Sequence, residues 1–365
     1  MENNILHRLL TSIILCLFLW NSSLADTAGN QDIDSYNKSH NNKSHNNKSE
    51  KIEYHLNKLK EEMPRLDLSK KPVNSESAIK YFEYYGLNFK NTLHYFGSFN
   101  SKQKIIAGHV FLPDNPAGTV LLLHGYLDHS GILKNLISNC LESGYAVAVF
   151  DLPGHGLSSG EMASVDDFSE YISALDDFLK KYYSVLPEPL NLIGHSTGCS
   201  VAFDYLSKFK DKEISKVIFL SPLVHTAYWE TFKTGYYFFG IFFKKFKRYF
   251  RNNSRDTEYI EFIKNDPLQA REIPVKWLKA LYLWNKRVEK YDVLSKRVLI
   301  IQGDDDATVD WKYNIEFFRK KVKPLEVKMI KNARHQLINE IVPERSIVFD
   351  IINDELEKSL NEGIK

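Results

Sequence analysis

After Tyr81, short apolar segments alternate with longer segments in which apolar residues recur every three or four positions. The short segments, such as TVLLLHG and VAVFD, contain almost no polar residue, which is typical of strands buried on both faces of a parallel sheet. The longer segments have the period of amphipathic helices. This alternation predicts an α/β fold, in which helices flank a mostly parallel sheet.

The expected strands and helices can be placed along the chain. LHYFGSF and QKIIAGHVFLP predict an antiparallel pair of strands that begins the sheet. A buried strand is expected in GTVLLLHGY, and further strands are expected in YAVAVFDLPG, LNLIGHS, KVIFLSPL, RVLIIQG and LEVKMIKNARH. Helices are expected in SGILKNLISNCLESG, VDDFSEYISALDDFLKKYYSVL, TGCSVAFDYLSKF and WKYNIEFFRKK, and in a closing helix from Pro343.

From His225 to about Tyr291 the alternation stops, and the chain becomes rich in aromatic and cationic residues. This pattern predicts a helical cap inserted at about 225–291, over the sheet edge where α/β folds bind ligands. YYFFGIFFKKFKRYFR has the spacing of one apolar helix face with cations beside it, formed by Phe239, Phe242, Phe243, Phe246 and Phe250 with Lys244, Lys247, Arg248 and Arg251. One interpretation is that the face packs on the sheet domain, and the other is that it forms an apolar wall over the active site whose basic rim contacts anionic lipid or a phosphate group. Both can hold along one helix.

The first residues predict a secretory signal peptide over 1–25. Arg8 precedes an apolar run from Leu9 to Trp20, and Ser23-Leu24-Ala25 has the small-x-small form of a cleavage site. The alternative is an uncleaved anchor helix, but the run is too short to span about 30 Å of hydrocarbon. We therefore expect a secreted or periplasmic protein.

Residues 26–52 predict a disordered polar spacer. They include the repeat HNNKSHNNKS and too few apolar residues to offset the entropy of ordering. Its histidines have no cysteine or carboxylate cluster beside them, so a metal site is not expected there. Residues 53–365 remain as the folded domain.

Composition excludes several classes of partner. The chain has 48 Lys and Arg against 46 Asp and Glu, so no broad positive field is available to bind nucleic acid. Cys16 lies in the predicted leader, so the mature chain would keep only Cys140 and Cys199, and two cysteines make no disulfide framework. No metal-ligand spacing is present. We expect neither a metal nor another cofactor.

LIGHSTGCS contains the pattern G-x-S-x-G around Ser196. The pattern is short enough to arise by chance, but here it joins a predicted strand to a predicted helix, which is the setting of a nucleophile elbow. Gly194 and Gly198 suit that turn because side chains there would clash.

A serine nucleophile needs a base, and the base needs an acid that orients it. Downstream, one predicted strand ends in Asp304-Asp305-Asp306 and another ends in His335. This order of serine, acid and histidine is that of the fold in which such elbows occur. Spacing alone does not select one of the three aspartates.

Five motifs, GTVLLLHGYLDHSG, FDLPGHGLSSG, LIGHSTG, IQGDDDATVDW and NARHQLINE, together resemble the α/β-hydrolase superfamily. Within it they are similar to the monoacylglycerol lipase and lysophospholipase branch, also called the serine aminopeptidase S33 or hydrolase-4 group. The resemblance implies that Asp306 is the acid and His335 the base. It also implies an oxyanion hole made by the backbone NH groups of Tyr126 and Thr197, residues that differ from those frequent in the family.

The predicted function is that of a serine hydrolase that cleaves carboxylic esters of single-chain lipids through an acyl-enzyme. The lipid ester would be a lysophospholipid or a monoacylglycerol, and the cap would contact a membrane surface. Two alternatives stay open at this point. One is a peptidase or small-ester hydrolase with the same triad, and the other is a catalytically silent member that binds lipid or a partner protein.

Overall fold

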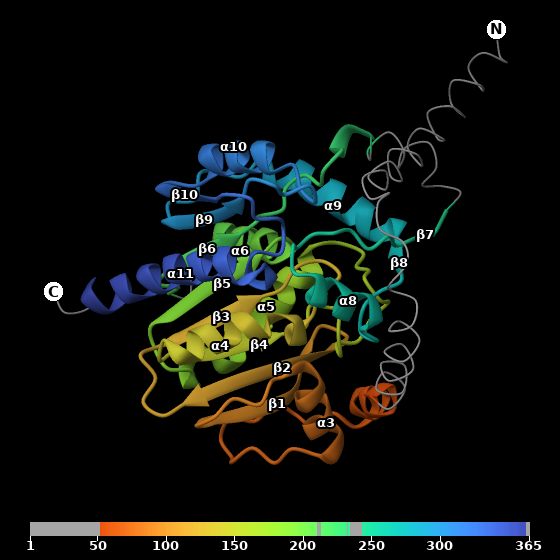
Figure 1. Cartoon of the computed structure of the whole chain (residues 1–365), viewed down its shortest axis with the longest axis vertical. Coiled ribbons are helices and arrows are strands. Elements are labelled where there is room, and N and C mark those ends of the chain that lie inside the picture. Colours follow the sequence, from red (N-terminus) through yellow and green to blue (C-terminus); the bar gives the residue numbers. More distant parts are fainter. Residues whose placement is uncertain (1–51, 210–212, 232, 234–242, 363–365) are drawn as a thin grey trace, which may run out of the picture.

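The computed structural model describes residues 52–209, 213–231, 233 and 243–362 (Figure 1). In this part of the chain the predicted α/β architecture is confirmed, with one mostly parallel sheet between two layers of helices. The predicted signal peptide over 1–25 and nearly all of the predicted spacer lie outside the described residues. Among the described residues, no helix is long and apolar enough to cross a membrane.

The central sheet has eight strands in the order β1-β2-β4-β3-β5-β6-β9-β10. β2 pairs antiparallel with both of its neighbours, and all the other neighbours pair parallel. The strands are β1 (Thr92–Ser101), β2 (Lys104–Pro113), β3 (Thr119–Leu123), β4 (Ala146–Phe150), β5 (Leu190–His195), β6 (Val217–Leu220), β9 (Val298–Gly303) and β10 (Leu325–Ile330).

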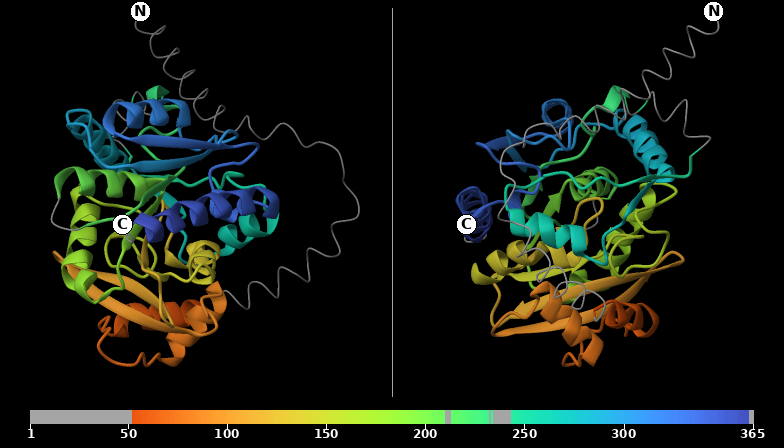
Figure 2. Two further views of the ribbon diagram at one scale, coloured as in Figure 1. Left: turned by 90° about the vertical axis from the view of Figure 1, so that its left-hand side faces the viewer. Right: turned by 45° about the vertical axis from the view of Figure 1, so that its right-hand side comes forward.

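Helices cover both faces of this sheet (Figures 1 and 2). One face packs against α5 (Ser169–Tyr182), α6 (Thr197–Lys208), α9 (Val275–Val288) and α10 (Trp311–Lys321). The other packs against α3 (Glu76–Tyr85), α4 (Lys134–Glu142) with the short η2 (Ser130–Leu133) before it, and α11 (Val342–Glu362). In β3, Leu121 enters the first core and Leu122 the second, so the strand must be apolar throughout.

Two helices that precede the sheet were not predicted from the sequence. Residues 52–62 are helical, and their buried Ile52, Leu56 and Leu59 recur at helical spacing. Ile52, placed by the prediction at the end of the spacer, is therefore the first described residue of a packed helix. α3 follows, with Ser75 accepting a hydrogen bond from the backbone of Ala78 as its N-cap.

The cap contains α8 (Thr257–Asn265), α9 and a two-stranded sheet of β7 (Lys245–Lys247) and β8 (Glu272–Pro274). The predicted helix over Tyr236–Arg251 is wrong in its described part, because Lys245–Lys247 are extended and pair with β8. Phe239 and Phe242 lie outside the described residues. Aromatic residues favour strands as well as helices, and here the backbone pairing with β8 decides.

A buried ion pair fastens the cap to the sheet domain. Nε2 of His129 lies 2.8 Å from Oδ2 of Asp266, and both side chains are completely buried. Burial alone would lower the pKa of His129, but the Asp266 carboxylate outweighs it and raises that pKa. The hydroxyl of Tyr85 in α3 donates to the other carboxylate oxygen at 2.6 Å. Three separate segments therefore meet at Asp266.

A second buried carboxylate fastens α9 to α6, the helix that follows Ser196. Asp204 of α6 is completely buried and accepts hydrogen bonds from Nε1 of Trp284 at 3.1 Å and from the hydroxyl of Tyr291 at 2.8 Å. Arg287 of α9 lies 3.4 Å from the same carboxylate. The position of α9 is thus set by the helix that begins at the predicted nucleophile.

Candidate active site

Ser196 occupies a sharp turn between β5 and α6. Its backbone has φ 51° and ψ −112°, a conformation that residues other than glycine rarely adopt. A Cβ at Gly194 would lie 2.7 Å from the backbone nitrogen of Cys199, and one at Gly198 would collide with the carbonyl group of Leu123. Both flanking glycines are therefore required by close backbone packing.

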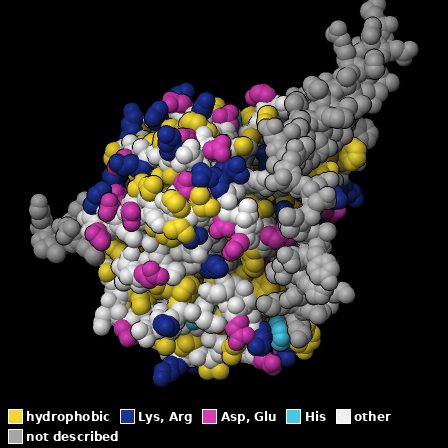
Figure 3. All heavy atoms as spheres, viewed as in Figure 1, with side chains coloured by type: hydrophobic (Ala, Val, Ile, Leu, Met, Phe, Trp, Pro, Cys, Tyr) yellow, Lys and Arg dark blue, Asp and Glu magenta, His cyan; other side chains and the backbone are white. Residues whose placement is uncertain are grey.

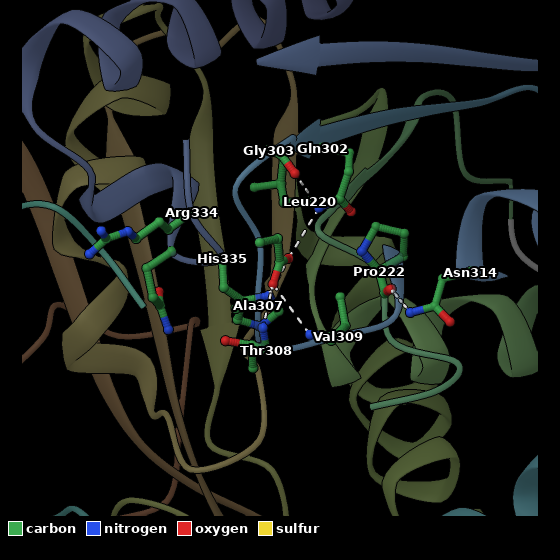
Figure 4. Close-up of polar contacts among 12 residues, drawn as sticks. Leu220, Pro222, Gln302, Gly303, Ala307, Thr308, Val309, Asn314, Arg334 and His335 are labelled. Carbon is green, nitrogen blue, oxygen red and sulfur yellow. Dashed lines mark hydrogen bonds and ion pairs between the residues drawn. The ribbon is translucent and has the colours of Figure 1, made fainter. Parts of the chain in front are cut away.

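His335 lies on the loop after β10 and contacts the loop after β9 through Asp306. Nδ1 of His335 is 2.8 Å from Oδ2 of Asp306. Nε2 of Gln302 donates to the same oxygen at 3.0 Å, and Oδ1 accepts the backbone NH groups of Thr308 and Val309 at 2.8 and 3.2 Å. Figure 4 shows these bonds converging on one carboxylate between Gln302, Val309 and His335.

The neighbouring aspartates have other partners. Asp304 accepts the backbone NH of Asn332 at 2.6 Å, and Asp305 pairs with Nε of Arg334 at 3.1 Å. Of the three carboxylates, the structure thus places only Asp306 on His335, as the family resemblance implied. Its role in catalysis stays a prediction.

The environment of Asp306 keeps its carboxylate charged. Burial alone would raise the pKa of Asp306, but the interaction with His335 and the hydrogen bonds from Thr308 and Gln302 lower it below its usual range. A charged carboxylate accepts the proton of Nδ1, which leaves Nε2 of His335 free to act as a base.

Ser196 and His335 are both buried, with 6 % and 4 % of their surface exposed. His195, which precedes Ser196, contacts the carbonyl oxygen of His335 through Nε2 at 3.1 Å. The hydrogen bonds of the described residues include none from the Ser196 hydroxyl. The structure therefore joins His335 to Asp306 directly and to the elbow through His195. A hydrogen bond between a catalytic serine and its histidine often forms only when substrate binds.

The predicted oxyanion hole combines the start of α6 with the turn after β3. Thr197 is the first residue of α6, where backbone NH groups are free of helical partners. Across from it, a Cβ at Gly125 would lie 3.2 Å from Cβ of Ser196, so the turn that leads into Tyr126 runs directly against the elbow. His124 supports this turn because Nδ1 contacts the carbonyl oxygen of Gly125 at 2.8 Å.

The bulky ring of Tyr126 is turned into the cap. It stacks on Trp277 of α9, with 3.5 Å between ring centroids and 11° between planes. Its hydroxyl donates to the carbonyl oxygen of Ala163 at 2.8 Å. Since the ring has its own packing site, only its backbone is needed at the oxyanion hole.

One buried polar network behind the site was missed by the sequence interpretation. Oδ2 of Asp128 accepts a hydrogen bond from Gln336 at 3.1 Å and lies 3.5 Å from Nδ1 of His195. Burial alone would raise the pKa of Asp128, but His195 and Gln336 outweigh it and bring that pKa to about 2. The network joins the turn that carries Tyr126, the residue before Ser196 and the residue after His335.

Two further reactive side chains of these motifs, Cys199 and His155, have structural partners. Cys199 is buried and its Sγ contacts the carbonyl oxygen of Gly194 at 3.1 Å, as expected for a packed thiol. His155 contacts the carbonyl oxygen of Pro153. Within the described ranges, no group of three or more His, Cys, Asp or Glu could hold a metal ion.

Comparison with known proteins identifies the family. Residues 114–342, well over half of the chain, match Hydrolase_4, the serine aminopeptidase S33 family. The chain belongs to this family. Its relatives include the phospholipase YtpA of Bacillus subtilis, 27 % identical over 246 residues that cover 65 % of this chain and 93 % of that protein. The monoglyceride lipase of Saccharomyces cerevisiae is 25 % identical over 282 residues, 70 % of this chain and 89 % of the relative.

Solved structures show the same fold. A soluble variant of the Saccharomyces cerevisiae monoglyceride lipase aligns with a TM-score of 0.63 at 21 % identity, over 72 % of this chain and 94 % of that one. A monoacylglycerol lipase from Paleococcus ferrophilus aligns with a TM-score of 0.56 at 22 % identity, over 67 % and 94 %. The predicted α/β-hydrolase fold is thereby confirmed.

The three aspartates provide a direct test of the site. We expect Asp306→Asn to lower kcat by about 10⁴-fold, because the amide no longer holds His335 in the required tautomer. Asp305→Asn removes a charge one residue away and should change kcat by less than about tenfold, since its partner Arg334 is half-exposed. Both variants would be assayed with a soluble chromogenic ester after their folds are compared by circular dichroism. Equal losses in the two variants would contradict the assignment of the acid.

Proposed function

We propose that this S33 family member hydrolyses carboxylic esters of single-chain lipids, either lysophospholipids or monoacylglycerols, through an acyl-enzyme. The observation that carries the proposal is the Asp306–His335 pair, which is held against the strained elbow of Ser196 beneath an aromatic cap. Relatives named phospholipase and monoglyceride lipase support an ester of a lipid rather than a peptide.

In the proposed reaction, Oγ of Ser196 attacks the ester carbonyl carbon while Nε2 of His335 takes the hydroxyl proton. The backbone NH groups of Tyr126 and Thr197 stabilise the oxyanion, and His335 returns the proton to the leaving alcohol. Water then attacks the acyl-enzyme with His335 again as base, which releases the fatty acid and restores Ser196. Asp306 stabilises the imidazolium in both steps.

The first test is hydrolysis by the wild type and by Ser196→Ala. We expect the wild type to be labelled by a fluorophosphonate probe and to gain in kcat/KM as the acyl chain of a monoacylglycerol lengthens. Ser196→Ala should lose the labelling and nearly all turnover. A preference for short esters or for peptides would favour the peptidase or small-ester alternative. Absence of labelling in the folded wild type would favour the catalytically silent alternative.

We also propose that the cap contacts a membrane surface through β7 and its flanks. Phe243, Phe246 and Tyr249 have 51 %, 38 % and 50 % of their surface exposed. Exposed apolar side chains that gather in one place, unlike single ones, are typical of contact sites. Exposed lysines alternate with these rings, and in Figure 3 hydrophobic and basic side chains lie together where Figure 1 places β7. Aromatic rings flanked by lysines fit an anionic lipid surface.

This contact predicts weaker binding to phosphatidylglycerol-containing vesicles when the two phenylalanines are replaced. The double variant Phe243→Ser, Phe246→Ser should bind at least about tenfold more weakly in vesicle sedimentation, because two rings no longer enter the lipid. A matched control is Val185→Ser, Ile347→Ser, which changes side chains that are 59 % and 51 % exposed on other elements. If both double variants bind like the wild type, the cap does not form the docking surface.

Export is proposed from the leader pattern alone. The leader would direct the chain across a membrane, and cleavage after Ala25 would release the mature chain, which would meet lipid from the outer side. Sequencing the N-terminus of the purified mature protein tests this, and a chain that still begins at Met1 would favour the anchor alternative.

A further inference from the structure

Arg248, which follows β7, is a half-buried cation with unusual partners. Its Nη1 donates to Oε1 of Gln269 at 2.6 Å and to the carbonyl oxygen of Ala270 at 3.2 Å, and the guanidinium lies 4.3 Å from the ring centroid of Phe250. All these partners are uncharged, and among the described residues no carboxylate forms an ion pair with Arg248. A cation withdrawn from water without a counter-ion is costly unless something anionic binds it.

Gln269 adds a second incomplete donor at the same place. It is only 2 % exposed, and its Oε1 is already used by Arg248. Its Nε2 is buried and has no hydrogen-bond partner within the described part of the chain. Buried amide donors are nearly always paired in native proteins, so the unpaired Nε2 indicates a missing acceptor.

The segment that carries Arg248 runs across the catalytic loops. Nη1 of Arg251 donates to the carbonyl oxygen of Ala307, next to Asp306, at 3.1 Å. The carbonyl oxygen of Asn253 accepts the backbone NH of Gln336, next to His335, at 2.9 Å. Residues 248–254 thus connect the Arg248–Gln269 pair to the loops of the acid and the base.

The guanidinium of Arg248 interacts electrostatically with groups of the oxyanion turn. Burial lowers the pKa of Arg248. Asp128 and Tyr126 of that turn oppose this shift, as does Tyr259 of α8, whereas nearby Arg271 lowers the pKa further. Asp128 is hydrogen-bonded to Gln336 and lies close to His195. Its carboxylate acts on Arg248 from a distance and forms no ion pair with it among the described residues, so the guanidinium has no carboxylate in contact.

We propose that Arg248 and Gln269 bind a phosphate group, so that the site selects single-chain lipids with a phosphate-bearing head group over neutral monoacylglycerols. This inference rests on the proposed function and names the substrate class within it. The guanidinium supplies N–H donors in a planar fork that matches phosphate oxygens, and the amide of Gln269 supplies another donor. The same chemistry would also hold a free phosphate ion, and the experiment must separate these two sources.

The experiment compares two substrates with the same acyl chain, 1-oleoylglycerol and 1-oleoylglycerol 3-phosphate. The quantity measured is the ratio of kcat/KM for the phosphate ester to that for the neutral ester. Arg248→Gln should lower this ratio by about 10- to 100-fold, the worth of buried hydrogen bonds to a charged group. Arg248→Lys keeps the charge without the fork and should restore part of the ratio.

Arg271→Gln is the matched control. Arg271 also lies over the ring of Phe250, at 5.2 Å, but its guanidinium donates to the carbonyl oxygens of Lys264 and Asp266. This variant should leave the ratio within about twofold of wild type. Thermal melting of each variant shows whether it is folded. If Arg248→Gln is unfolded, the ratio measured for Arg248→Lys decides the test.

A second measurement is calorimetric titration of the full chain with inorganic phosphate. A fall in the ratio confined to the Arg248 variants supports a lipid head group as the occupant. An unchanged ratio with phosphate binding that depends on Arg248 supports the free ion. An unchanged ratio without Arg248-dependent phosphate binding overturns the inference. If the wild type hydrolyses neither lipid, the proposed function fails, and the titration alone still decides whether the phosphate site exists.

Discussion

The backbone of Ser196 at positive φ is the constraint on which the rest of the site depends. A hydroxyl can stand out at the end of a parallel strand only if the chain reverses within one residue and enters a helix at once. That reversal brings the start of α6 against β3, where a Cβ at Gly198 would meet the carbonyl group of Leu123. The backbone NH of Ser196 donates a hydrogen bond to the carbonyl oxygen of Leu220 in β6, and this bond helps to hold Ser196 in its strained conformation.

Around this fixed turn, the loops of the site are joined by buried carboxylates. Asp306 holds His335, Asp128 lies between His195 and Gln336, and Asp266 holds His129 beside the same turn after β3. Each carboxylate is withdrawn from water, and each has its pKa lowered because cationic or hydrogen-bonding partners outweigh the effect of burial. Loss of one partner would leave a buried charge, so these loops resist independent movement.

The features that depend on local sequence could be predicted, and those that depend on distant partners could not. The buried strands and the glycines around Ser196 follow from apolar runs and from backbone sterics, which act within a few residues. In contrast, Asp128, His195 and Gln336 come from three separate motifs, and nothing in their spacing shows that they meet. The predicted helix over 236–251 was wrong in its described part because pairing with β8, some 27 residues away in the chain, outweighs the local period.

The cap has a different physical character from the site that it covers. The elbow, acid and base make the chemistry general, because any ester carbonyl that reaches Ser196 meets the same groups. Among the described residues, the cap contributes side chains that the protein itself leaves without a full set of partners, namely exposed rings on and beside β7, a guanidinium without a carboxylate in contact and an amide donor without an acceptor. Such incomplete groups lower stability unless a ligand or a surface completes them. In the proposed function these needs are met separately, because the rings would contact the lipid surface while the guanidinium and the amide would bind the phosphate of the substrate.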